Sequence, residues 1–211
     1  MENVAEVVAG QLLQIKAIKL QPSNPFTWAS GWISPIYCDN RKALSYAPVR
    51  TYIKQEFAKM VEALYPQADV IAGVATGAIA QGALVADLLD KPFVYIRSAP
   101  KGHGLENLIE GDLRPGQKVV IVEDLISTGG SSLKAVEAVR KSGCEVLGMV
   151  AIFTYGFQTA GDNFQKAGVK LDTLSNYKTL IDVASKTGYV TTGDVAALND
   201  WRKDPASWGQ K

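Results

Sequence analysis

Apolar residues of this chain recur at two spacings, and the two alternate along most of its length. Short apolar runs at residues 69–74, 93–96, 118–123 and 145–153 predict buried strands, and the segments 78–89 and 131–141 between them have the spacing of helices. Strands that alternate with helices in this way form parallel sheets that are covered on both faces. We therefore predict an α/β fold with a mostly parallel, twisted sheet flanked by helices.

The two ends of the chain add helices and a region of a different kind. Further helices are predicted at residues 4–18, 48–64, 158–167, 178–186 and 195–201, with a short strand at 171–174. Residues 26–41 are rich in aromatic and β-branched residues that Gly31 and Pro35 interrupt, which indicates short strands joined by loops. We expect a small N-terminal hood over about residues 20–45, outside the main sheet, and a single domain over residues 1–211.

Composition narrows the class of protein. The chain has 22 Lys and Arg against 21 Asp and Glu, so its net charge of +1 shows no footprint of a polyanion, and we expect no nucleic-acid partner. Cys38 and Cys144 lack metal or redox spacing and are expected to stay reduced. The amino terminus has no basic n-region, and no apolar run reaches the roughly 20 residues that span a bilayer. We expect a cytoplasmic protein with no membrane partner.

The most informative polar positions follow the predicted strand at residues 118–123. Four apolar residues run into the adjacent acids Glu123 and Asp124, and a hydroxyl- and glycine-rich turn at 127–131 leads into the next helix. We expect Glu123 to end the strand and Asp124 to begin the turn, so that both carboxylates face one ligand. Backbone N–H groups at a helix N-terminus hold anions. This arrangement suits a ligand with vicinal hydroxyls and a phosphate, such as ribose 5-phosphate.

Two simpler interpretations of this segment compete with a ligand site. An ordinary strand–turn–helix with a Ser or Thr N-cap gives the same turn, but it leaves the adjacent like charges of Glu123 and Asp124 unexplained. A Walker loop is another phosphate cradle, but no Gly-Lys-Ser/Thr sequence occurs in the chain.

A second polar segment, residues 97–107, lies between the predicted strands 93–96 and 118–123. It contains the only histidine, His103, between two glycines, and Lys101 projects to the same side of an extended chain. A long connection without clear structure is usually functional or disordered. Opposite a phosphate site, cations on a lid suit the release of pyrophosphate; a solvated surface loop is the alternative. Residues 73–79, where a strand runs through small residues into a helix, either hold pyrophosphate or only allow close packing.

Together these motifs resemble those of the type I phosphoribosyltransferases. Residues 119–131 have the order of that family's signature for phosphoribosyl pyrophosphate (PRPP). Residues 24–32 and 34–41 resemble the hood of its orotate phosphoribosyltransferase branch. Residues 97–111 resemble the flexible catalytic loop, and 150–155 the strand after the PRPP helix. The similarity spans about residues 12–208.

The resemblance implies an enzyme that transfers ribose 5-phosphate from PRPP to N1 of orotate. The products are orotidine 5′-monophosphate and pyrophosphate, a step of de novo UMP synthesis. It implies Mg²⁺ as the cofactor, held mainly through PRPP oxygens rather than by a metal site of the protein. It also implies a homodimer in which the loop of one subunit closes over the site of the other.

Carried over by position, the resemblance also implies a set of site residues. Arg97, Lys101 and His103 would contact the pyrophosphate of PRPP, the last two across the dimer interface. Glu123 and Asp124 would hold the ribose hydroxyls, and Ser127 would also touch orotate. The 5-phosphate would be wrapped by Leu125, Ile126, Ser127, Thr128, Gly129, Gly130 and Ser131.

The implied catalytic residues are Asp124, Lys101 and His103. The bond between C1 and pyrophosphate breaks through an oxocarbenium-like state, so Asp124 would stabilise the cationic ribose while Lys101 and His103 neutralise the departing charge. Whether His103 also donates a proton stays open at this point.

Two alternatives remain: a purine-using enzyme of the same fold, and a regulator that senses PRPP or nucleotides without turnover. The regulator is supported by Ile33, which stands where many relatives carry a lysine, and Gly102 replaces an acid that is usual in the loop. The hood favours the orotate branch over the purine one, and a regulator has little use for a lid with Lys101 and His103.

Overall fold

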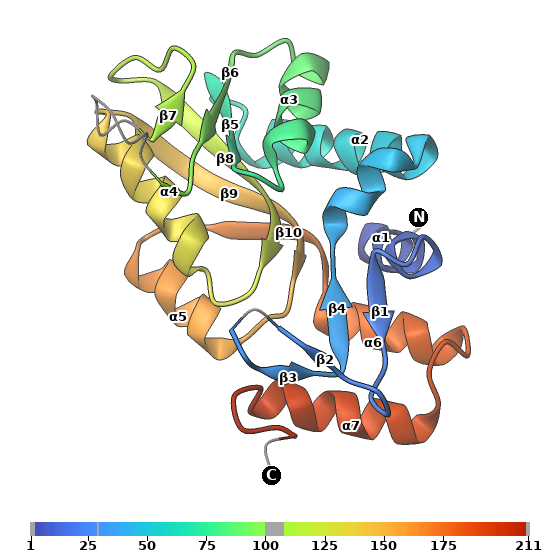
Figure 1. Ribbon diagram of the computed structural model, residues 1–211. Coiled ribbons are helices and arrows are strands. Elements are labelled where there is room, and N and C mark those ends of the chain that lie inside the picture. The colour runs from blue at the N-terminus through green and yellow to red at the C-terminus, as the bar shows by residue number, and fades with distance from the viewer. Residues whose placement is uncertain (1–2, 29, 100–107, 210–211) are drawn as a thin grey trace.

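The computed structural model of the chain describes residues 3–28, 30–99 and 108–209. Its centre is a six-stranded sheet in the order β10-β9-β8-β5-β6-β7. The strands are, in chain order, β5 (Val70–Val74), β6 (Phe93–Ile96), β7 (Ile109–Glu110), β8 (Lys118–Ile126), β9 (Glu145–Thr154) and β10 (Leu171–Asn176). All neighbours pair in parallel except β7, which is antiparallel to β6 at the edge. The prediction of a mostly parallel sheet is confirmed (Figure 1).

Helices cover both faces of this sheet. They are α1 (Val4–Gln14), α2 (Ala47–Leu64), α3 (Ile79–Leu88), α4 (Gly130–Lys141), α5 (Gln158–Lys166), α6 (Tyr177–Lys186) and α7 (Thr192–Lys203). α4 and α5 lie on one face, and α1, α2, α3 and α6 lie on the other (Figure 1). In β8, Val119 and Ile121 pack in the cluster that contains α4 and α5, whereas Val120 and Val122 pack in the other. Burial on both faces is why this strand reads as a continuous apolar run.

The residues before α2 form the predicted hood. β1 (Ile18–Leu20) pairs antiparallel with β4 (Ile36–Cys38), and β2 (Phe26–Thr27) pairs antiparallel with β3 (Ile33–Ser34). A 3-10 helix, η1 (Asn40–Ser45), follows and leads to α2. The hood lies beside α7 (Figure 1), and the rings of Trp28 and Trp201 meet edge to face at 5.6 Å. These short strands are separate from the six-stranded sheet, as predicted.

Several predicted boundaries were wrong. The first helix ends at Gln14 instead of residue 18, because Lys16 has a positive φ of 55° that turns the chain into β1. β8 does not end at Glu123 but continues through Asp124 to Ile126, since β9 runs beside it as far as Thr154. β10 likewise runs to Asn176, two residues beyond its predicted end. β7 lies just after the polar segment of residues 97–107, in a stretch for which no strand was predicted.

A glycine in β9 permits a close approach between the sheet and α2. The register between β8 and β9 shifts where Val119 pairs with Val146 and Val120 pairs with Gly148, so Leu147 is the extra residue of a β-bulge. A Cβ atom on Gly148 would overlap the hydroxyl of the buried Tyr65. That hydroxyl donates a hydrogen bond to Oδ2 of Asp172 at 2.7 Å. A side chain at residue 148 therefore disturbs this part-buried hydrogen bond as well as the packing.

We predict that Gly148→Ala lowers the free energy of unfolding by about 1–3 kcal/mol, because the added methyl group displaces Tyr65. Gly161→Ala is the matched control, since a Cβ at that position of α5 meets nothing within 4 Å. The control is expected to raise the free energy of unfolding by up to about 1 kcal/mol, because alanine is the better helix former. Urea unfolding measures both. A Gly148→Ala protein as stable as the unsubstituted chain would contradict the proposed overlap.

Candidate functional site

The acidic doublet lies near the carboxyl end of β8, in a cavity of about 420 Å³. Glu123 and Asp124 share this cavity, called here the acidic cavity, with the turn of residues 74–77 after β5 and with Ser131 at the start of α4. A Cβ atom on Gly77 would overlap the Asp124 carboxylate, so only glycine lets the turn come this close. The two sequence segments singled out as phosphate-binding candidates are therefore brought together at one edge of the sheet.

Glu123 is buried, with 5% of its surface exposed, and both of its carboxylate oxygens have partners. Oε1 accepts a hydrogen bond from the backbone N–H of Asp124 at 2.9 Å, and Oε2 accepts one from the Ser132 hydroxyl at 2.8 Å. Burial, followed by the negative charge of Asp124, raises the pKa of Glu123 to about 8. Glu123 therefore favours its protonated form at neutral pH in the ligand-free protein.

The turn between β8 and α4 presents backbone donors. Gly129 is the N-cap of α4 with a φ of 82° and gives no side-chain cap, so the first N–H groups of the helix remain available to an anion. A Cβ atom on Gly129 would also press on the ring of Phe164. The turn is fixed from α5, because Nδ2 of Asn163 donates a hydrogen bond to the Thr128 carbonyl at 3.0 Å. Gly130 lies open, with nothing within 4 Å of a Cβ built there.

The other predicted residues of this segment lie in different surroundings. Leu125 and Ser131 line the acidic cavity, and Ser127 lines a second cavity described below. The side chain of Ile126 is fully buried, so only its backbone can face a ligand. Its carbonyl accepts a hydrogen bond from the N–H of Tyr155 at 3.1 Å.

The second cavity, of about 290 Å³, has aromatic walls. Its lining residues are Thr27, Trp28, Tyr37, Cys38, Leu125, Ser127 and Tyr155. It shares Cys38 and Leu125 with the acidic cavity, so the two cavities adjoin. Trp28 and Tyr37 come from the hood, and Tyr155 follows β9. All three aromatic residues belong to segments that resemble the family, but none of them was predicted to belong to the site.

One hydrogen bond attaches the hood to the acidic strand. Nδ2 of the buried Asn40 donates to the backbone carbonyl of Asp124 at 2.7 Å. The thiol of Cys38 in turn donates to Oδ1 of Asn40 at 3.2 Å. Burial, followed by the negative charges of Asp124 and Asp39, raises the pKa of the Cys38 thiol well above its usual value. Cys38 is therefore held as a neutral thiol between the two cavities.

Asp39 and Arg41, which flank Asn40, also line the acidic cavity. The Arg41 guanidinium binds both carboxylate oxygens of Asp39, at 2.7 and 3.1 Å, and holds the pKa of that carboxyl below its usual range. Neither residue was predicted to belong to the site. The signal available in the sequence was a pair of opposite charges next to the aromatic hood segment.

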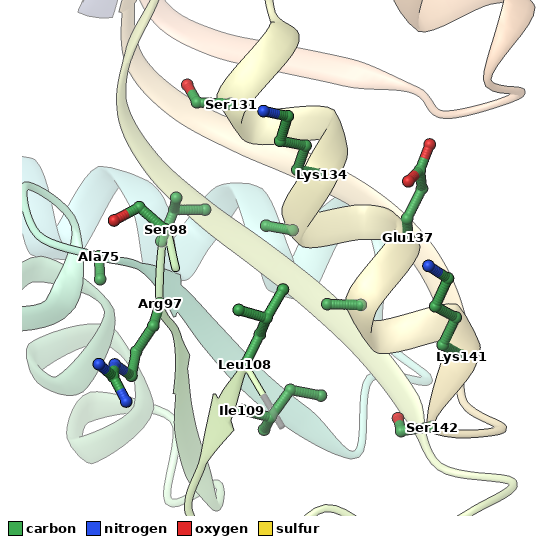
Figure 2. A pocket seen from close by; sticks show the side chains of 13 residues that line it. Ala75, Arg97, Ser98, Leu108, Ile109, Ser131, Lys134, Glu137, Lys141 and Ser142 are labelled. Atoms are coloured by element: carbon green, nitrogen blue, oxygen red, sulfur yellow. The ribbon is translucent and has the colours of Figure 1, made fainter. Parts of the chain in front are cut away.

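A third cavity, of about 490 Å³, lies between α4 and the strands β6 and β7 (Figure 2). It adjoins the acidic cavity through Val74, Ala75 and Ser131. Arg97 lines it, but Figure 2 shows its guanidinium extending away from α4, and its Nη1 lies 3.4 Å from Oε1 of Glu110. Lys101 and His103, the predicted lid cations, lie outside the described residues.

The described residues lack two features that other classes of protein have. The part of the chain that the structure describes contains no group of three or more His, Cys, Asp or Glu side chains able to enclose a metal ion. None of its helices combines the length and the apolar character needed to cross a bilayer.

The raised pKa of Glu123 predicts how stability depends on pH. The native protein keeps a proton on Glu123 up to about pH 8, whereas the unfolded chain releases it near its ordinary pKa of about 4.5. Because the native state binds more protons in this window, this carboxyl lowers stability as pH rises from about 4.5 to about 8. A glutamine has no such proton, and its amide accepts from the Asp124 N–H and donates to Ser132.

We therefore expect Glu123→Gln to gain stability relative to the unsubstituted protein between pH 5 and pH 9, with a gain that grows as the pH rises. Denaturant unfolding at pH 5, 7 and 9 measures this difference, and the comparison within one pair of proteins removes the titration of all other groups. A difference that stays constant over this range would show that Glu123 titrates alike in the native and unfolded states.

Known proteins include a family that matches most of this chain and relatives that are similar to it over nearly its whole length. The phosphoribosyl transferase domain matches residues 43–186. An orotate phosphoribosyltransferase of Bacteroides thetaiotaomicron is 65% identical over 208 residues, which cover 99% of this chain and 98% of the relative. An orotate phosphoribosyltransferase of Porphyromonas gingivalis is 61% identical over 209 residues, with coverage of 99% and 100%.

A solved structure agrees with these relatives. The crystal structure of orotate phosphoribosyltransferase from Aeropyrum pernix superposes with a TM-score of 0.76 at 29% identity, covering 87% of this chain and 99% of that one. The matched domain includes both strand ends that meet in the acidic cavity. With a match to most of the chain and full-length relatives above 60% identity, the chain belongs to the phosphoribosyltransferase family, in its orotate phosphoribosyltransferase branch.

Proposed function

We propose that the chain transfers ribose 5-phosphate from PRPP to N1 of orotate, giving orotidine 5′-monophosphate and pyrophosphate in pyrimidine biosynthesis. The observation that carries this proposal is that the acidic cavity and the aromatic cavity adjoin at Cys38 and Leu125. A sugar phosphate and a flat base held in these two places have their reacting atoms next to each other. The relatives with 61–65% identity bear the name of this enzyme.

The acidic cavity supplies what the donor needs. Glu123 and Asp124 are the acids of this cavity that can accept hydrogen bonds from the ribose hydroxyls, and such a bond is worth about 1.5–3 kcal/mol where the carboxylate is ionised. The uncapped N-terminus of α4 and the hydroxyls of Ser127, Thr128 and Ser131 suit the 5-phosphate. The turn of residues 74–77 and Arg97, on neighbouring strand ends, are assigned to the pyrophosphate.

The aromatic cavity supplies what the base needs. Orotate is planar, and Trp28, Tyr37 and Tyr155 offer ring faces and edges to it. The Ser127 hydroxyl gives this cavity a hydrogen-bonding group at the end that meets β8.

Chemically, the base acts as the nucleophile and pyrophosphate is the leaving group. As N1 of orotate forms its bond to C1 of ribose, the C1–oxygen bond breaks and its electron pair leaves with pyrophosphate. Asp124 stabilises the positive charge that develops on the ribose, and Lys101 and His103 of the loop neutralise the charge that develops on pyrophosphate. A loop closed over the site also excludes water from the cationic intermediate state.

The proposal includes Mg²⁺ as the cofactor. The described residues contain no cluster of three metal-binding side chains, and both oxygens of Glu123 have partners already. This donor set fits a Mg²⁺ ion that takes most of its ligands from PRPP and water. When bound, the ion supplies positive charge to the pyrophosphate. We further propose a cytoplasmic homodimer in which the loop of each subunit serves the site of its partner.

The first test mixes the protein with PRPP, Mg²⁺ and orotate and follows the ultraviolet absorbance of orotate. We expect the orotate band to decay with formation of the nucleotide. Turnover of a purine base but not of orotate would favour the purine-using alternative, and no turnover with any base would favour the sensor.

In the same assay Asp124→Asn, a substitution of equal size, is expected to lower kcat by about 100-fold or more. Its free energy of unfolding should change far less; a near-native kcat would refute the role of Asp124.

Mixed dimers test whether the loop acts in trans. One subunit carries Lys101→Ala and the other carries Asp124→Asn, so each pure homodimer lacks a needed group at both of its sites. In the mixed dimer, the intact loop of the second subunit covers the intact Asp124 of the first. We expect about one active site per mixed dimer, measured by initial rates after purification with two different tags. A mixed dimer as inactive as the two homodimers would assign the loop to the site of its own subunit.

A further inference from the structure

The acidic cavity has an imbalance of charge that bears on how it accepts a polyanion. Among the described residues that line it, Asp39, Glu123 and Asp124 are acids, and Arg41 is the one cation. The proposed donor carries a phosphate and a pyrophosphate group. Of these four side chains, the Arg41 guanidinium is therefore the one that can donate charge-assisted hydrogen bonds to phosphate oxygens of the ligand.

The backbone fixes Arg41 relative to the acidic strand. Its neighbour Asn40 opens η1 and donates its 2.7 Å hydrogen bond to the Asp124 carbonyl. The side chain is oriented by Asp39, because Nε and Nη2 of Arg41 bind the two carboxylate oxygens at 2.7 and 3.1 Å. A guanidinium has five N–H donors in a rigid fork, so this pair leaves about three of them for a ligand.

The pair itself contributes little to the stability of the fold. The Arg41 side chain is 59% exposed and the Asp39 side chain 20% exposed, and an ion pair with a solvent-exposed member is worth between about 0 and 1 kcal/mol. Arg114 and Asp112 form a similar pair, also two residues apart, with side chains 76% and 74% exposed, and they do not line the acidic cavity. Substitutions in the two pairs therefore distinguish the effect of losing a group of the acidic cavity from the effect of losing an ion pair.

We propose that Arg41 binds the pyrophosphate group of PRPP, and that Asp39 is a positioning residue that aims the guanidinium. This inference rests on the function proposed above. Arg41 shares the acidic cavity with Ala75, Thr76 and Gly77, which are assigned to pyrophosphate, and it does not line the aromatic cavity of the base. A guanidinium binds phosphate oxygens in a bidentate manner, which an ammonium group does not reproduce.

Steady-state kinetics separate the two substrates. We expect Arg41→Ala to raise the KM for PRPP by about 10- to 100-fold and to change the KM for orotate by less than about twofold. Arg41→Lys should fall between, and Arg114→Ala should match the unsubstituted enzyme. An unchanged KM for PRPP, or a rise confined to the KM for orotate, would overturn the proposal. Circular dichroism melting curves, expected to be unchanged for these exposed positions, show that the variants are folded.

Asp39→Asn tests the positioning role. It should raise the KM for PRPP by a smaller factor than Arg41→Ala, and it should have no further effect when Arg41 is already alanine. Additive effects of the two substitutions would show that Asp39 does not act through Arg41. Calorimetric titration of the unsubstituted protein and of Arg41→Ala with magnesium pyrophosphate tests the contact without requiring turnover. Equal affinity of both proteins for it would refute the contact, whereas absent turnover in the unsubstituted protein would refute only the proposed function.

Discussion

The arrangement of the site depends on one buried carboxyl group. Glu123 lies inside the sheet near the end of β8, where an unpartnered charge is costly, and its two oxygens bind the N–H of Asp124 and the hydroxyl of Ser132. The first of these hydrogen bonds fixes the backbone of the neighbouring acid, and the second ties the strand to the first turn of α4. The N-terminus of α4 and the acidic strand are therefore held in fixed positions relative to each other.

A second connection brings the hood into the same geometry. Asn40 and Asp124 are 84 residues apart, and their hydrogen bond places the hood across the acidic cavity. Trp28 of the hood packs against Trp201 of α7, and the ring centroids of Trp28 and Tyr155 lie 5.2 Å apart. Nε of Arg202 donates a hydrogen bond to the Tyr155 carbonyl at 3.1 Å. The walls of the aromatic cavity are thus supported by elements from both ends of the chain.

The sequence was sufficient to predict the parts of the fold that follow from local patterns. Runs such as residues 118–123 are apolar because both faces of their strand are buried, and this predicted the parallel sheet and its helices. It was not sufficient where pairing overrides local preference. Asp124 has a low strand propensity, yet it lies within β8 because β9 continues beside it, and the two-residue β7 has no periodicity to read.

The residues of the site likewise divide into those that the sequence predicted and those that it did not. The doublet Glu123–Asp124 and the turn after it were found because like charges and glycines at a strand end are unusual in sequence. Trp28, Tyr37 and Tyr155 were missed because an aromatic residue in the sequence looks the same whether it packs in a core or lines a cavity, and Arg41 was missed because a charged residue looks the same whether it faces a cavity or open solvent. Their role follows only from contacts between distant segments, such as the hydrogen bond of Asn40. The predicted roles of Lys101 and His103 stay predictions.

The raised pKa of Glu123 also explains how three acids can lie together in the acidic cavity of the ligand-free protein. Burial and the charge of Asp124 favour a proton on Glu123, which removes one negative charge from a wall that already contains Asp39 and Asp124. A ligand that brings a divalent cation reverses this preference, since a nearby positive charge favours the ionised carboxylate. Under the proposed function, the acids then strengthen as acceptors for the ribose hydroxyls only once the magnesium-loaded donor is in place. An acid-lined cavity is therefore compatible with a polyanionic substrate, because that substrate brings a divalent cation that adds to the single positive charge of Arg41.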